Sequence, residues 1–71
     1  MAQAEIIEHL EKEDKPLARR EIAIALDMNL ELCSKALTKL LRWQEIKCIE
    51  IDRFEAKLRF NVNRRMLLYY I

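Results

Sequence analysis

The chain has 71 residues, with 52% hydrophobic and 35% charged residues and a net charge of +1. This length fits one domain, and this composition is too apolar for a disordered chain. No apolar run approaches the roughly 18 residues of a membrane-spanning helix, and the N-terminal stretch carries acids where a signal peptide carries cations. We therefore expect a cytoplasmic protein of one domain, residues 1–71, with no membrane partner.

The first predicted element is a helix from Ala2 to about Glu13 with an acidic outer face. Its apolar residues at helical spacing are Ile6, Ile7 and Leu10. Residues 1–14 hold five acids against one lysine, a net charge of −4, so the remainder carries +5. The only histidine, His9, falls on the polar face of this helix, where a solvated role is expected rather than a catalytic one.

A second helix is predicted from about Ala18 after a break at Lys15-Pro16-Leu17, because proline cannot continue a helix. The break has room for a very short strand. The inward face of the second helix is predicted to comprise Ile22, Ala23 and Leu26. Ala18 stands where a capping Ser or Thr is expected, and the missing cap costs on the order of 1 kcal/mol.

A tight turn at Asp27-Met28-Asn29 leads into a third, amphipathic helix that runs to about Gln44. Asn29 suits its N-cap, and Asp27 and Asn29 are the best candidates for positive φ in a chain without glycine. One half of the helix is predicted to be apolar: Leu30, Leu32, Cys33, Ala36, Leu37, Leu40, Leu41 and Trp43. The other half is polar, with three cations and two hydroxyl side chains: Glu31, Ser34, Lys35, Thr38, Lys39 and Arg42. Such a helix is anchored on one side and free to touch a partner on the other; Trp43 is expected in the core or at its rim.

Residues 46–62 change to an alternating pattern that predicts a hairpin of two half-buried antiparallel strands. Ile49 and Ile51 alternate with acids in the first strand, and Phe54 to Val62 alternates in the second. The connection is predicted near Asp52-Arg53-Phe54-Glu55. Residues 63–71 then contain the basic pair Arg64-Arg65 and the apolar run MLLYYI, which must be buried, either on the first helix or against a second copy.

No sequence feature points to catalysis, a metal or a cofactor. Cys33 and Cys48 lie in apolar segments without a CxxC motif or a Cys/His cluster, which favours two reduced core thiols. The chain has one histidine, no glycine-rich phosphate loop and too little length to enclose a substrate pocket. We therefore expect that it is not an enzyme and binds no small-molecule ligand.

The order helix, short extended piece, helix, turn, helix, hairpin resembles the winged helix-turn-helix domain of bacterial and archaeal transcriptional regulators, over about Leu10 to Val62. Glu21-Ile22-Ala23, Leu26-Asp27 and Asn29 are similar to the family's Glu-Ile-Ala, turn and helix cap. Further matches are the paired leucines Leu37 and Leu40 and the wing start Ile46. Asp27 and Gln44-Glu45 replace glycines of the pattern, and Ala18 replaces its capping hydroxyl. The resemblance implies an α+β fold with a helix-turn-helix over residues 18–44, a wing over 46–62 and an apolar C-terminal segment over 63–71.

This resemblance implies sequence-specific binding of double-stranded DNA by a small transcriptional regulator, with the third helix in the major groove. The DNA-binding residues would be Arg19, Arg20, Ser34, Lys35, Thr38, Lys39, Arg42, Arg53 and Lys57. Those of the third helix would face bases or phosphates, Arg19 and Arg20 would hold the backbone, and Arg53 and Lys57 would act from the wing tip.

A second reading is a winged helix that docks proteins and binds no DNA, through the acidic first helix or the apolar C-terminal segment. Under the first reading, a homodimer through the C-terminal segment is expected, since small helix-turn-helix proteins commonly read two half-sites.

Overall fold

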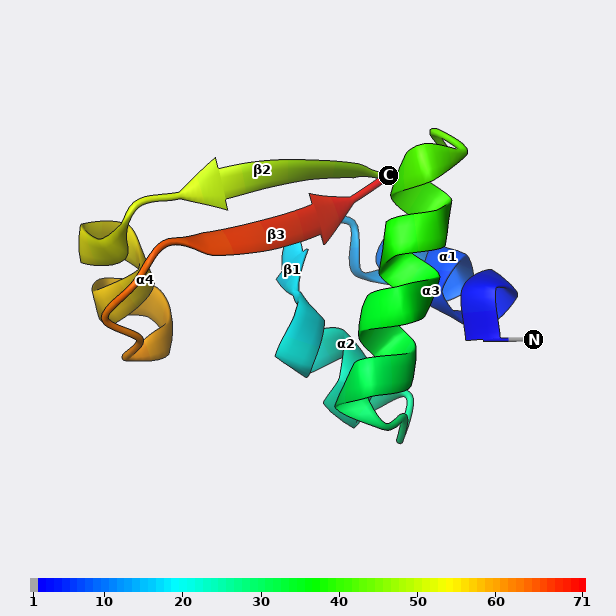
Figure 1. Cartoon of the computed structure of the whole chain (residues 1–71), viewed down its shortest axis with the longest axis horizontal. Helices are drawn as coiled ribbons and strands as arrows, with labels where there is room; N and C mark the ends of the chain where they lie inside the picture. Colours follow the sequence, from blue (N-terminus) through cyan, green and yellow to red (C-terminus); the bar gives the residue numbers. More distant parts are fainter. Residues whose placement is uncertain (1) are drawn as a thin grey trace.

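The protein, described by a computed structural model over residues 2–71, is an α+β fold with four helices and a three-stranded antiparallel sheet (Figure 1). The elements in chain order are α1 (Ala2–Glu13), β1 (Leu17–Ala18), α2 (Arg19–Ala25), α3 (Leu30–Arg42), β2 (Lys47–Ile51), α4 (Arg53–Phe60) and β3 (Met66–Tyr70). The predicted first, second and third helices are confirmed, as is the short strand after Pro16. Within residues 2–71, no helix combines the length and apolar character needed to cross a bilayer.

The start of α2 shows how the chain manages without a capping hydroxyl. Ala18 is the N-cap residue and has no side chain able to accept a hydrogen bond. The backbone N–H of Ala18 instead donates to Oε1 of Glu21, at 2.9 Å, so the N3 carboxylate ties back to the N-cap. This explains the glutamate of the Glu-Ile-Ala tripeptide.

The N-cap of α3 is as predicted. The Asn29 side-chain oxygen accepts hydrogen bonds from the N–H groups of Glu31, at 2.8 Å, and Leu32, at 3.4 Å. The buried stripe of α3 is narrower than the predicted apolar half, because Leu30, Leu32 and Trp43 are 41%, 59% and 58% exposed. Only Cys33, Ala36, Leu37 and Leu40 are buried.

A residue with positive φ follows each of the four helices, at Asp14, Asp27, Gln44 and Asn61. Two of these positions, Asp27 and Gln44, are ones where the resemblance expects glycine. Asp27 has φ 53° after α2, as predicted, and Gln44 has φ 59° after α3. In each turn two N–H groups reach back to the last helical turn, as Glu45 does to the Leu40 carbonyl at 2.9 Å. The prediction for Asn29 was wrong, since its φ is −62°.

The apolar run at the C-terminus forms β3, the middle strand of the sheet. The strand order is β1-β3-β2, and Leu68 lies opposite Ala18 on one side and Ile49 on the other. A strand with neighbours on both edges and buried side chains on both faces reads as a continuous apolar segment rather than an alternating one. Leu68 and Tyr69 are accordingly buried, so the centre of the segment is covered within its own chain, whereas Leu67 and Ile71 are 43% and 47% exposed.

The predicted second strand of the hairpin, Phe54 to Val62, is wrong: residues 53–60 form α4. Local signals for a helix outweigh the alternating pattern. The Asp52 side chain accepts a hydrogen bond from the Glu55 N–H at 2.9 Å, and the Glu55 and Arg59 side chains form an ion pair at 2.9 Å one turn apart. Ala56 is the one buried residue of α4, and with the half-buried Phe60 it packs α4 against the sheet. The hairpin therefore joins β2 and β3, with α4 in the connection.

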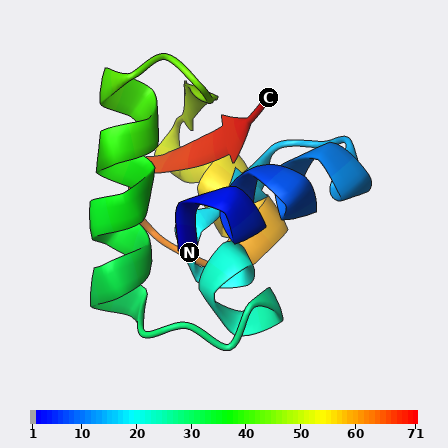
Figure 2. The same ribbon diagram turned by 90° about the vertical axis from the view of Figure 1, so that its right-hand side faces the viewer.

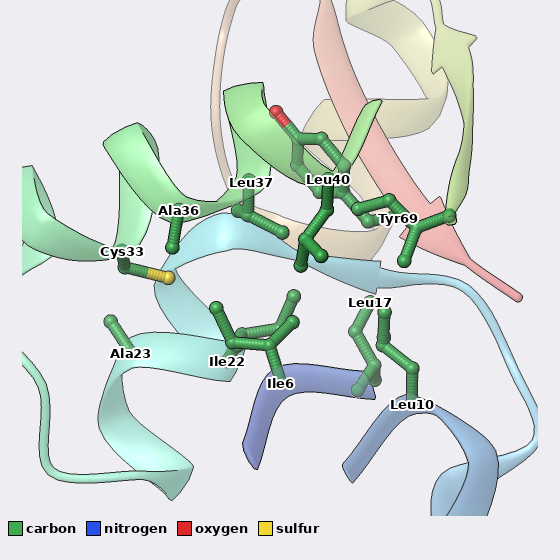
Figure 3. Close-up of a cluster of buried hydrophobic side chains, with 11 residues drawn as sticks. Ile6, Leu10, Leu17, Ile22, Ala23, Cys33, Ala36, Leu37, Leu40 and Tyr69 are labelled. Atoms are coloured by element: carbon green, nitrogen blue, oxygen red, sulfur yellow. The ribbon is translucent and has the colours of Figure 1, made fainter. Parts of the chain in front are cut away.

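The main core lies between helices α1, α2 and α3 and one face of the sheet, with α3 standing upright at the edge of the molecule (Figure 2). Figure 3 shows that Ile6, Ile22 and Leu37 point toward one another, beneath Tyr69 of the sheet. A second, smaller cluster occupies the other face of the sheet under α4. Its buried members are Ala18, Ile51, Ala56 and Leu68.

The left-handed turn after α3 allows a stabilising substitution. We expect Gln44→Gly to raise the free energy of unfolding by about 0.5–1 kcal/mol, because the left-handed conformation costs a residue with a Cβ more than it costs glycine. The midpoint of thermal unfolding should rise by roughly 2–8 °C for a domain of this size. Gln44→Ala is the matched control and should give no gain. A glycine variant that melts below the wild type would contradict the assigned turn.

Candidate nucleic-acid interface

The outward face of α3 brings five of the predicted DNA-binding residues together. A shallow hollow of about 350 Å³ is lined by Ser34, Lys35, Thr38, Lys39 and Arg42. All except the half-buried Ser34 are exposed. The buried stripe on the opposite side of the helix fixes this orientation, since Cys33, Leu37 and Leu40 are anchored in the core.

The two hydroxyl groups on this face have their protons directed into the helix. Ser34 Oγ donates to the Leu30 carbonyl at 3.0 Å, and Thr38 Oγ1 donates to the Ser34 carbonyl at 2.9 Å. Thr38 Oγ1 retains its accepting lone pairs, and Ser34 Oγ, which also accepts from Arg19 Nη1, retains one. The hydroxyls are therefore set to accept hydrogen bonds from a ligand rather than to donate them.

The cations on this face differ in whether they have an ion-pair partner. Lys35 Nζ lies 3.9 Å from a carboxylate oxygen of Glu31, and both side chains are more than two-thirds exposed. Such a pair contributes little to stability, so Lys35 can exchange its partner for a ligand phosphate at little cost. Within residues 2–71, no ion pair involves Lys39 or Arg42.

Arg19 contacts the outward face of α3 and also lines a neighbouring groove. Its Nη1 donates to Ser34 Oγ at 3.0 Å, which joins the start of α2 to the middle of α3. Arg20 is exposed beside it. Arg19, which was predicted to hold the DNA backbone, therefore lies in direct contact with the outward face of α3.

A groove of about 250 Å³ continues from Arg19 and Arg20 to two further arginines, Arg64 and Arg65. Its apolar wall is formed by Ala18, Leu30, Val62, Met66, Leu67 and Tyr69. Arg65 Nη1 lies 3.9 Å from Glu50, and both side chains are largely exposed. Arg64 and Arg65 were not among the predicted DNA-binding residues. The sequence shows that they form a basic pair. It does not show the pairing of β3 with β1, which brings them beside α2.

Arg53 and Lys57 do not join this surface as predicted. They belong to α4, and neither lines the hollow on α3 or the arginine groove. The prediction placed them at the tip of a hairpin. The helix that replaces the hairpin carries them to the far end of the molecule (Figure 1).

The two cysteines line neither the hollow on α3 nor the arginine groove. Both are free, with Cys33 buried and Cys48 half-buried, as predicted for core thiols. Cys33 Sγ lies 3.8 Å from the Arg19 carbonyl, to which it donates. Within residues 2–71, no cluster of His, Cys, Asp and Glu side chains is arranged to hold a metal ion.

Burial of the Cys33 thiol and the Tyr69 hydroxyl makes the stability of the fold sensitive to alkaline pH. Desolvation raises the pKa of the Cys33 thiol, with the nearby Arg19 opposing the shift, and desolvation also raises the pKa of Tyr69. The unfolded chain therefore loses these protons at lower pH than the folded chain. We expect the free energy of unfolding to fall from about pH 8.5 upward, as measured by urea unfolding at several pH values. Cys33→Ala should reduce this decline, and equal declines in both proteins would contradict the assignment.

The geometry thus joins the face of α3, through the contact between Arg19 and Ser34, to the arginine groove. The resulting cationic surface contains Arg19, Arg20, Lys35, Lys39, Arg42, Arg64 and Arg65. No family model, curated protein or solved structure matches the chain.

Proposed function

We propose that the chain binds double-stranded DNA through the outward face of α3 and acts as a small sequence-specific transcriptional regulator. The observation that carries the proposal is the grouping of Ser34, Lys35, Thr38, Lys39 and Arg42 around one shallow hollow on an anchored helix. The major groove of B-DNA, about 12 Å wide, admits one helix. A helix whose opposite side is buried presents its cations and hydroxyls to that groove without rearrangement.

The chemistry of the face fits contacts to both bases and phosphates. Lys39 and Arg42 can donate to guanine acceptors or to phosphate oxygens. The outward lone pairs of Ser34 and Thr38 suit the amino groups of adenine or cytosine, which are donors in the major groove. Because every base pair carries one such amino group, the hydroxyl geometry favours contact with the adenine or cytosine of the pair rather than with the thymine or guanine.

The arginine groove supports the proposal as a contact for the phosphate backbone. Arg19, Arg20, Arg64 and Arg65 lie beside the N-terminal half of α3, where a strand of a duplex docked on α3 would run. Guanidinium groups bind phosphate oxygens in a bidentate manner. These four side chains would fix the position of the duplex while α3 reads its bases.

The architecture supports a winged helix-turn-helix assignment. Helices α2 and α3 are joined by a tight turn, and the antiparallel strands β2 and β3 follow. Strand β3 also pairs with β1, the short strand between the first two helices. In this assignment α4 occupies the place of the wing loop. The wing would then contact DNA through Arg64 and Arg65, which lie between α4 and β3, rather than through Arg53 and Lys57 of α4.

A titration of a short mixed-sequence duplex, followed by fluorescence anisotropy at about 50 and 200 mM salt, tests the proposal. Contacts by four to six of the seven cations predict a slope of about −4 to −5 for log affinity against log salt. Enrichment of sequences from a random duplex pool then tests specificity. Absence of binding at the lower salt concentration would overturn DNA binding and leave protein docking as the function.

A homodimer through the C-terminal segment stays a prediction, but the need to cover an exposed apolar segment no longer supports it. That segment was expected to need either the first helix or a second copy to cover it. Strand β3 has β1 and β2 on its two edges, and Tyr69 packs in the core with Ile6 and Leu10. Neither a dimer nor a docked protein is needed to bury this segment.

A further inference from the structure

Helix α4 carries a ridge of two apolar side chains that nothing in its own chain covers. Phe54 and Leu58 are 70% and 87% exposed, and Leu58 is the most exposed large apolar side chain within residues 2–71. They are four residues apart and so lie on one face of the helix. Adjacent exposed apolar side chains of this size are a typical feature of interaction surfaces. We call this pair the α4 ridge.

The α4 ridge has a cationic border. Arg53 and Lys57 are exposed, and no ion pair within residues 2–71 involves either of them. The Arg53 guanidinium lies 5.3 Å from the centre of the Phe54 ring. Arg59 is paired with Glu55, and Asp52 accepts the N–H of Glu55 at the helix start, so these acids are already engaged. A partner of the ridge should therefore combine an apolar surface with free carboxylates.

A hollow with this chemistry lies between the end of α1 and the C-terminus. It measures about 310 Å³ and is lined by Leu10, Glu11, Asp14, Lys15, Pro16, Tyr70 and Ile71. Apolar and charged side chains share its lining, and the charged ones are Glu11, Asp14 and Lys15. The neighbouring outer face of α1 adds Glu8 and Glu13, which are also exposed and belong to no ion pair of the described chain. We call this feature the α1 hollow.

The two surfaces lie toward opposite ends of the molecule. Its longest extent is 34 Å, with α4 at one end and α1 toward the other (Figure 1). The ridge of one molecule cannot reach its own hollow. Four acids, Glu8, Glu11, Glu13 and Asp14, outnumber the two cations Lys12 and Lys15 at this end of α1, which complements the cationic border of the ridge. A second copy of the chain is therefore the occupant that the structure itself supplies.

We propose that the chain associates head to tail, with the α4 ridge of one copy docked in the α1 hollow of the next. Phe54 and Leu58 would contact Tyr70 and Ile71. Arg53 and Lys57 would face Glu11 and the adjacent acids of α1. Because the contact joins two different surfaces, each dimer keeps one free ridge and one free hollow, and growth continues beyond two copies unless the chain closes into a ring.

Sedimentation velocity without DNA tests the proposal, independently of the proposed function. We expect the wild-type mass to rise with protein concentration beyond that of a dimer and to fall with added salt, which screens the charged border. Leu58→Asp removes the ridge, and the double variant Glu11→Lys/Ile71→Lys reverses the hollow. Each variant alone should be monomeric. An equimolar mixture should form a dimer and stop there, since it contains one intact ridge and one intact hollow for each pair.

The controls separate this contact from a general loss of solubility or folding. Leu32→Asp makes the same change at another exposed leucine, 59% exposed on α3, and should leave the association unchanged. Circular dichroism should show each variant folded, because every substituted side chain is exposed. A wild type that stays monomeric at all concentrations, or a mixture of the two variants that stays monomeric, would overturn the proposal.

Discussion

Replacement of Leu68 by alanine is expected to lower the free energy of unfolding by about 2–5 kcal/mol, the usual cost of emptying a buried leucine site. Leu68 is fully buried in the middle strand, opposite Ala18 and Ile49, in the cluster that holds α4 against the sheet. Domains of this size have a total stability of about 4–11 kcal/mol. The substitution should therefore remove a large share of it, as measured by urea unfolding monitored by circular dichroism.

Leu67→Ala is the matched control, one residue earlier on the opposite face of the same strand. Leu67 is 43% exposed, so its truncation should cost well under half as much. Similar losses at both positions would contradict the central placement of β3. Loss of stability only at Leu67 would indicate a register shifted by one residue, which reverses the two faces of a strand.

The double substitution Lys35→Ala/Lys39→Ala is expected to weaken DNA binding by about 10- to 100-fold at low salt and to reduce the magnitude of the salt slope by about 2. Both lysines line the hollow on α3, and neither is buried. Their removal should therefore change affinity and leave stability nearly unchanged. Anisotropy titrations and thermal unfolding of the same preparation measure the two effects.

Lys12→Ala/Lys15→Ala removes the same charge from the end of α1 and is the matched control. If the loss of affinity follows net charge alone, the two double variants will weaken binding equally, and α3 will have no special role. If the loss of affinity depends on contacts between DNA and the outward face of α3, only Lys35→Ala/Lys39→Ala will lose affinity. Arg64→Ala/Arg65→Ala should reduce the slope as well, with little effect on sequence preference, because phosphate contacts carry no base information.

The helical half of the fold could be predicted from the sequence because its signals are local. Apolar spacing defined α1, and Asn29 caps α3 with its own side chain. The turn residue Asp27 was identified because few residues besides glycine tolerate a positive φ. Gln44 was not identified, because glutamine has no special preference for this conformation. It is held there by the backbone hydrogen bonds that close the helix end.

The second half was predicted poorly because two patterns conflicted. Residues 53–60 alternate as a strand does, yet Asp52 and the ion pair of Glu55 with Arg59 favour a helix, and these local contacts decide the structure. The error propagated to the site. Arg53 and Lys57 moved to the far end of the molecule, whereas Arg64 and Arg65 came beside α2 through a strand pairing that no local pattern reveals.

The position of β3 in the chain affects how the protein can fold during its synthesis on the ribosome. The middle strand follows both of its neighbours in the chain, so β1 and β2 are synthesised before the strand that pairs with them exists. Helices α1 to α3 can collapse early from nearby contacts, but the sheet must wait for residues 66–70 to emerge. Nascent chains that stall before that point will display a half-built core, and they are the form most exposed to proteases and to chaperones.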